Sequence, residues 1–297
     1  MPPDAPGLRR DEQRAKLSAF YARFVTTRAR SGDPRVEAAF GAVPREPFAG
    51  PAPWSISARG PWSDRGQGPS YVETPDDDPA FLYQDVLIAL DPARGINIGE
   101  PSLHARCLDA LAVQPGETVL QIGAGSGYYS ALLAELVGPA GRVHAFEIDA
   151  DLARRAALNL APWKQAVVEG RSGAEDGLPA ADAIYVNAGL DRPSWAWLDA
   201  LRPGGRLLFP LQPESGWGGM LYLRKPVEGG LTWPAHFVTR AAFIACQTRQ
   251  DPKTGRGLAT AFAGPGFEAV KSLRLGGSPD ESCWFDGDEW WLSTDAA

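Results

Sequence analysis

A regular alternation of short apolar segments and amphipathic segments between residues 118 and 210 constrains the fold more than any other feature of this sequence. Short apolar runs bounded by turn residues are typical of buried parallel strands, and the amphipathic runs between them are typical of connecting helices. We therefore predict an α/β fold built on a doubly wound parallel sheet. The expected strands are 118–122, 142–147, 166–168, 182–186 and 206–210, and the expected helices follow a glycine turn at 123–127 and lie near 152–160 and 195–201.

The first part of the chain is predicted to be helical. Four apolar residues recur at the spacing of one helix face, which predicts a helix over 11–30 that packs through this stripe: Leu17, Phe20, Tyr21 and Phe24. Asp33 and Pro34 then supply a cap and a first turn for a second short helix. From residue 44 to residue 78 the sequence is rich in proline and glycine and predicts an irregular excursion, in which Trp54 and Trp62 favour order.

These patterns divide the chain into three expected units. Residues 1–78 form the helical lead-in and irregular loop, and residues 79–226 form the α/β core, which begins with a helix over 101–112. Beyond residue 226 the alternation stops, and strand-like segments predict a small β-rich C-terminal extension over residues 227–297. Its expected strands are 241–246, 270–275 and 290–293.

Composition argues against several function classes. A formal net charge of -7 over 297 residues argues against a general nucleic-acid binder, and the sequence has no apolar run long enough to span a membrane. The three cysteines are far apart and lack metal-ligand spacing, which argues against a disulfide framework and a metal site. With no signal-like N-terminus, the chain is predicted to be cytoplasmic. His104, His144 and His236 are interpreted as packed or surface residues.

The glycine turn is the strongest candidate for a ligand site. Gly123, Gly125 and Gly127 lie where a strand ends and a helix begins, so a ligand can approach open backbone N–H groups. The third glycine of a dinucleotide fingerprint is replaced by Tyr128, which argues against a pyrophosphate ligand. Glu147 closes the next strand, where an acidic side chain can accept both hydroxyl hydrogens of a ribose. The alternative is a tight turn that binds nothing.

Three blocks of the sequence resemble the class I S-adenosylmethionine-dependent methyltransferases: VLQIGAGSGYYSALLAEL, VHAFEID and LRPGGRLLFPL. Three further stretches resemble the protein-L-isoaspartate O-methyltransferases in particular: DPRVEAAFGAVPREPF, LYQDVLIALDPARGINIGEPSLHA and DAIYVNAG. The resemblance covers about residues 12–225. It implies a seven-stranded methyltransferase sheet, S-adenosyl-L-methionine as cofactor and S-adenosyl-L-homocysteine as product.

The resemblance also implies where the cofactor binds. It places the methionine end of the cofactor on Gly123, Gly125 and Gly127, the ribose on Glu147 and the adenine beside Ile148. Two positions depart from the family. Gln121 stands where the family has an acidic residue that holds the cofactor's ammonium, and its amide supplies no charge. The pair Arg171 and Ser172 replaces an Asp-Gly pair that helps to fix the adenine.

The resemblance places the methyl acceptor at residues 96–101, where the family has a loop close to Gln-Thr-Ile-Ser before a proline. This chain has INIGEP there and lacks both hydroxyls. Asn97, Ile98 and Gly99 are expected to bind the substrate, and Asn97 and Asp85 are the catalytic candidates. Gly99 has a second interpretation, in which it permits a positive φ before the next helix.

The function that the resemblance implies is S-adenosylmethionine-dependent methylation of a carboxylate on a peptide or protein. A carboxylate is ionised near neutral pH and needs no general base, which agrees with the lack of a nucleophile–base arrangement. The changed loop predicts that isoaspartyl peptides are methylated poorly or not at all, and a gain only in an Asn97→Thr, Gly99→Ser variant would locate the change in this loop. Two alternatives stay open, a methyltransferase for a small molecule or modified peptide and a non-catalytic cofactor-binding protein.

Overall fold

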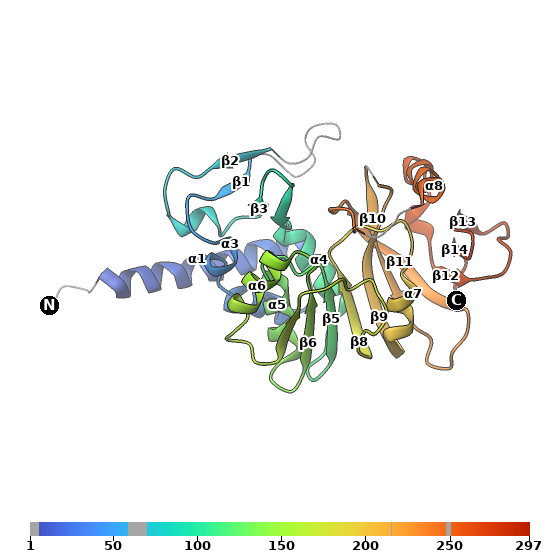
Figure 1. Cartoon of the computed structure of the whole chain (residues 1–297), viewed down its shortest axis with the longest axis horizontal. Helices are drawn as coiled ribbons and strands as arrows, with labels where there is room; N and C mark the ends of the chain where they lie inside the picture. Colours follow the sequence, from blue (N-terminus) through green and yellow to red (C-terminus); the bar gives the residue numbers. More distant parts are fainter. Residues whose placement is uncertain (1–5, 59–69, 215, 248–250) are drawn as a thin grey trace.

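The computed structural model describes residues 6–58, 70–214, 216–247 and 251–297 (Figure 1). Five parallel strands form one half of its large sheet, from the edge strand β7 inward, in the order β7-β6-β5-β8-β9. This part confirms the predicted doubly wound α/β core. The strand order reverses between β5 and β8, and such a switch point leaves a crevice at the carboxyl ends of the strands. The bounds are β5 (Thr118–Ile122), β6 (Arg142–Phe146), β7 (Ala166–Glu169), β8 (Ala181–Val186) and β9 (Leu201–Leu211).

The same sheet continues beyond β9 as antiparallel strands, so it has ten strands where seven were expected. An open edge presents unpaired backbone groups, and the returning C-terminal chain pairs with it. The predicted strand at 241–246 is wrong, because Ala241 ends β11 and the rest of the segment is a loop with one isolated bridge, from Ala245 to Gly189. The elements α8 (Pro252–Ala263) and η2 (Phe267–Ala269) were not predicted. The added strands are β10 (Gly218–Arg224), β11 (Thr232–Ala241), β12 (Ser272–Leu275), β13 (Cys283–Asp286) and β14 (Trp290–Ser293).

Helices cover both faces of the sheet. On β5, Val119 packs into one apolar cluster with the N-terminal helices, and its neighbour Leu120 packs into a second cluster with α7 and α8. Alternate residues of a strand point to opposite faces, so both faces are buried. The core helices are α4 (Pro101–Leu111), α5 (Tyr128–Val137), α6 (Ala150–Asn159) and α7 (Trp195–Ala200).

The lead-in consists of α1 (Pro6–Ala29), α2 (Pro34–Ala42) and α3 (Glu46–Ala49), and the first of these projects from the body in Figure 1. The predicted packing stripe of α1 is wrong in part. Tyr21 and Val25 are fully buried, whereas Phe20 is 66% exposed and stacks on Phe24 at a centroid separation of 5.8 Å. The helix carries apolar residues on two faces, and only the Tyr21 face meets the core.

The segment expected to be irregular contains part of a second sheet. Its strands run in the order β2-β1-β3-β4 and are antiparallel. Trp54 is buried beside this sheet, as expected, and Trp62 lies outside the described residues. The strands are β1 (Ser55–Ser57), β2 (Tyr71–Glu73), β3 (Ile88–Asp91) and β4 (Ile96–Ile98), with the short helix η1 (Pro79–Phe81) between β2 and β3.

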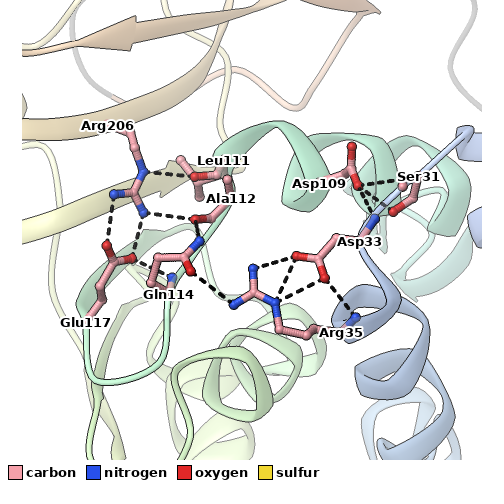
Figure 2. A network of polar contacts seen from close by, with 10 residues as sticks. Ser31, Asp33, Arg35, Asp109, Leu111, Ala112, Gln114, Glu117 and Arg206 are labelled. Carbon is pink, nitrogen blue, oxygen red and sulfur yellow. Dashed lines mark hydrogen bonds and ion pairs between the residues drawn. The ribbon is translucent and has the colours of Figure 1, made fainter.

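A polar network fixes the C-terminal end of α4 (Figure 2). One carboxylate oxygen of Asp109 accepts hydrogen bonds from the Ser31 hydroxyl at 2.7 Å and from the backbone N–H of Gly32 and Asp33 at 2.9 and 3.0 Å. From the opposite side, Arg206 of β9 donates to the carbonyl of Leu111 at 2.9 Å. The network therefore joins the lead-in and the sheet through the helix that follows residues 96–100.

The division at residues 78 and 226 stays a prediction. β1 and β2 share a sheet with β3 across the first position, and β10 pairs with β11 across the second. Within the described part of the chain, no helix combines the length and apolar character needed to cross a membrane.

Candidate active site

A cavity of about 580 Å³ lies at the carboxyl ends of β5, β6 and β8. Its walls include Ile122 and Phe146 at the strand ends, Asn187 just after β8, and residues from the β3–β4 hairpin. The segment 242–247, which follows β11, closes another side. The cavity therefore occupies the crevice that the strand order predicts, and the lead-in sheet and the C-terminal extension both complete it.

The glycine turn forms the floor of this cavity through Gly123 and Gly125, whose φ angles are +78° and +57°. Glycine adopts this left-handed conformation without the strain that a Cβ atom brings. Gly127 has a different role in the structure. It does not line the cavity, and a Cβ atom there would lie 3.2 Å from Leu160 and 3.4 Å from Ala156. Its small size lets α5 approach α6, and its predicted cofactor contact stays untested.

Glu147 reaches the glycine turn from the end of β6. Its carboxylate accepts hydrogen bonds from the N–H of Gly125 at 2.6 Å and of Asp149 at 2.9 Å. Burial raises the pKa of Glu147, and the backbone hydrogen bonds act against that rise. Ile148 lines the same wall and is half exposed. The predicted ribose and adenine residues therefore lie together beside the glycine turn.

Arg171 and Ser172 line the same region of the cavity. The Arg171 guanidinium lies 4.8 Å from the centre of the Phe146 ring and donates to Glu169 at 3.0 Å. The Ser172 hydroxyl accepts from the N–H of Ala174 at 3.2 Å. Both side chains are thus held by neighbours at the cavity wall, and their contact with a ligand stays a prediction.

Gln121 does not line the cavity. It is fully buried below the wall, where its amide oxygen accepts from the Ser130 hydroxyl. Asn187, the asparagine of the DAIYVNAG stretch, also lines the cavity, although its residue type and position had not marked it as a candidate. Its side-chain oxygen is buried and has no hydrogen-bond partner among the described residues. A buried unpaired acceptor on a cavity wall is a group that a ligand can satisfy.

The segment 96–100, which consists of β4 and the two residues after it, lines the opposite part of the cavity with Asn97, Ile98, Gly99 and Glu100. The Asn97 amide donates to the Gly95 carbonyl at 2.9 Å. The idea that Gly99 permits a positive φ is wrong, because its φ is not in that region. The reason for glycine is space, since a Cβ atom would lie 2.1 Å from Nε2 of His104.

Asp85 is placed apart from these residues and does not line the cavity. Its carboxylate accepts from the N–H of Ser102 at 2.8 Å and forms an ion pair with Arg28 at 2.7 Å. It therefore holds the first turn of α4, and its predicted catalytic role finds no support in this position.

Two further residues line the cavity that no sequence pattern predicted to be there. His104 lines the acceptor side of the cavity on α4, in the first turn after Pro101. Phe243 reaches the same side from the segment after β11, and both of its backbone groups bond to the Gln212 side chain, at 2.8 and 2.9 Å. Among the described residues, no group of three His, Cys, Asp or Glu side chains could hold a metal ion.

A parallel sheet with a glycine turn after β5 and an acidic residue at the end of β6 is the fold of a class I S-adenosylmethionine-dependent methyltransferase. Two solved structures share it at 17% identity. A protein-L-isoaspartate O-methyltransferase aligns with a TM-score of 0.59 over 95% of this chain and 88% of its own. A Plasmodium falciparum protein, solved as a putative protein-L-isoaspartate O-methyltransferase with S-adenosyl-L-homocysteine, aligns with a TM-score of 0.58 over 78% of this chain and 99% of its own.

The sequence specifies the family. Residues 71–235 match the protein-L-isoaspartate(D-aspartate) O-methyltransferase family, and the chain belongs to it. Its relatives include the protein-L-isoaspartate O-methyltransferase of Aeropyrum pernix, 39% identical over 48% of this chain, and that of Ignicoccus hospitalis, 32% identical over 54%. The matched region spans 56% of the A. pernix protein and 77% of the I. hospitalis protein.

Proposed function

We propose that this chain is an S-adenosylmethionine-dependent O-methyltransferase that methylates a carboxylate on a peptide or protein. The observation that carries the proposal is that the predicted cofactor-binding residues and the predicted acceptor-binding residues line the same cavity. Gly123, Gly125 and Glu147 line one part of it, and Asn97 and Gly99 line another. A ligand on the glycine turn and an acceptor at the loop would therefore face each other without an intervening wall.

The residues of this cavity fit the proposed cofactor. The left-handed glycines leave the backbone open, and Glu147 offers two carboxylate oxygens to a ribose. The unpaired side-chain oxygen of Asn187 supplies an acceptor on the same wall. When bound, S-adenosylmethionine supplies a methyl group on a sulfonium, and the C–O bond to the carboxylate forms as the C–S bond breaks, leaving a methyl ester and S-adenosylhomocysteine.

The protein's part in this reaction is alignment and exclusion of water. An ionised carboxylate is already a nucleophile near neutral pH, so proton removal is not required. Apolar side chains from three parts of the chain line the acceptor side and would keep water from the reacting groups. They are Leu87, Leu103 and Phe243.

Calorimetry with S-adenosylhomocysteine, followed by labelled-methyl transfer to an isoaspartyl hexapeptide and its aspartyl counterpart, tests the proposal. We expect binding, and transfer to the isoaspartyl peptide in preference to the aspartyl one. The rate of transfer to the isoaspartyl peptide in the same assay tests the prediction that this activity is weak. Binding without transfer to either peptide or to a small carboxylate would support the non-catalytic alternative, and no binding would reject the cofactor site.

The apolar acceptor side also favours a second candidate, methylation of a small carboxylate or a modified peptide. Transfer to small aromatic acids but to neither peptide would select it.

We further propose a cytoplasmic location without a nucleic-acid partner, which is supported by the cysteine usage and the net charge of -7. Cell fractionation and a nucleic-acid binding assay test these two points.

A further inference from the structure

The acceptor side of the cavity carries one carboxylate and no cation. We define this side by the lining residues 96–100, Leu87, Leu103, His104 and Phe243. Its carboxylate belongs to Glu100, the residue directly before α4. Burial lowers the pKa of His104 to about 3, so that ring is uncharged near pH 7. An acceptor that binds among these residues therefore meets a single negative charge.

The start of α4 does not explain why position 100 is acidic. Glu100 is the N-cap residue of this helix, but its side chain makes no capping hydrogen bond. The Asp85 carboxylate accepts from the N–H of Ser102 at 2.8 Å and so serves the first turn instead. The Glu100 carboxylate is thus part of the cavity wall without being needed to begin the helix.

The basic residue whose charge reaches Glu100 is already paired. Arg28 forms an ion pair with Asp85 at 2.7 Å, and neither of these two residues lines the cavity. Burial raises the pKa of Glu100 and the Asp85 carboxylate adds to the rise, whereas Arg28 and the Ser102 side chain act against it. The group holds two carboxylates and one guanidinium. A further anion on the acceptor side would therefore be repelled.

The two arginines of the cavity wall also have carboxylate partners. Arg94 donates to Asp149 at 2.7 Å, and Arg171 donates to Glu169 at 3.0 Å. An acceptor carboxylate would have to compete with these partners for either guanidinium. The positive charge that balances Glu100 is thus missing from the wall and has to come with the substrate.

We propose that Glu100 is a specificity-determining residue, which selects peptides in which a lysine or arginine side chain stands next to the carboxylate to be methylated. This inference rests on the proposed function and names its substrate class. The cationic side chain would pair with Glu100, while the adjacent carboxylate faces the glycine turn. A peptide with an acidic neighbour would bring a second like charge and be rejected.

Four isoaspartyl hexapeptides with blocked termini test this. Three have lysine, glutamine or glutamate on both sides of the isoaspartyl residue, and the fourth has glutamine there and lysine at both ends. The kcat and KM of transfer are measured beside the peptide Kd in the presence of S-adenosylhomocysteine. We expect the KM and Kd with adjacent lysine to be lower than with adjacent glutamate by about tenfold or more. The peptide with remote lysines should resemble the glutamine peptide within about twofold, because the effect is local.

Glu100→Gln removes the charge and keeps the shape of the side chain. In this variant we expect the tenfold ratio to fall to about threefold or less. Glu100→Asp retains the charge and should retain part of the ratio. The matched control is Glu281→Gln, which removes one carboxylate from an exposed position outside the cavity and should leave the ratio unchanged. An unchanged Kd for S-adenosylhomocysteine shows that each variant is folded.

The two readouts separate this inference from the proposed function. A lysine preference in the Kd that depends on Glu100, without methyl transfer, would keep the inference and reject the activity. Transfer to all four peptides with similar KM values would keep the activity and reject the inference. A lysine preference that persists in Glu100→Gln, or the failure of every peptide to bind, would also overturn the role of Glu100.

Discussion

Glu147 connects the glycine turn to β6 and offers the only carboxylate that bonds to that turn within the described chain. We expect Glu147→Ala to weaken binding of S-adenosylhomocysteine at least tenfold, because each charge-assisted bond to a ribose hydroxyl is worth about 1.5–3 kcal/mol. Calorimetry measures the Kd, and the exposed Glu228→Ala is the control. An unchanged Kd would show that the cofactor does not bind where we place it.

His104 should also make stability depend on pH. Its pKa in the folded chain is about 3, below the value of about 6.5 for an unfolded histidine. Between these values the unfolded chain binds a proton that the folded ring does not. The stabilisation is therefore complete above pH 6.5 and is lost as the pH falls toward 3.

Urea unfolding at pH 7.5 and pH 5.5 measures this effect. From the one histidine we expect the free energy of unfolding to fall by about 1.4 kcal/mol more in the natural chain than in His104→Gln. Lowered pKa values of other groups, such as His236, are common to both proteins and cancel in the difference. Equal pH dependence in the two proteins would contradict the buried neutral state.

At the scale of elements, Asp109 holds the turn between α1 and α2 with one oxygen. Asp109→Ala removes three hydrogen bonds from partly exposed groups, and we expect the free energy of unfolding to fall by about 2 kcal/mol. Because α4 directly follows the cavity-lining residues 96–100, the peptide KM should rise. Urea unfolding and peptide kinetics check both effects against the exposed Asp199→Ala. Natural stability in Asp109→Ala would show that the turn is held by other contacts.

The sequence predicted those features that depend on neighbouring residues, and it did not predict those that depend on contacts between distant elements. The strands from residue 118 to residue 211 and the glycine turn depend on neighbouring residues, and the prediction found them. The buried face of α1 could not be chosen, because apolar residues lie on two faces and the choice depends on where α2 and α4 pack. The pairing of Gly99 with His104 joins two elements, and no local pattern indicates it.

At the scale of the whole molecule, the C-terminal extension is part of the core packing. Trp233, Leu273 and Leu292 share an apolar cluster with Phe209 and Leu221 of the sheet. A chain that ends at residue 226 would leave this face uncovered, and we expect it to aggregate or to lose cooperative unfolding. Circular dichroism and size-exclusion chromatography of residues 1–226 beside the full chain test this. A stable monomeric fragment would instead support a true domain boundary there.

The cavity draws its walls from residues 87–247, so it exists only after distant parts of the chain have come together. Long loops lose entropy when they close, and contacts of this kind form late in folding. A ligand that contacts all of these segments therefore binds the native chain and does not bind partly folded states. Its binding free energy adds to native stability, by about 2.7 kcal/mol when the free ligand is at 100 times its Kd. The cell's supply of such a ligand would then govern how long each copy of the protein survives proteolysis.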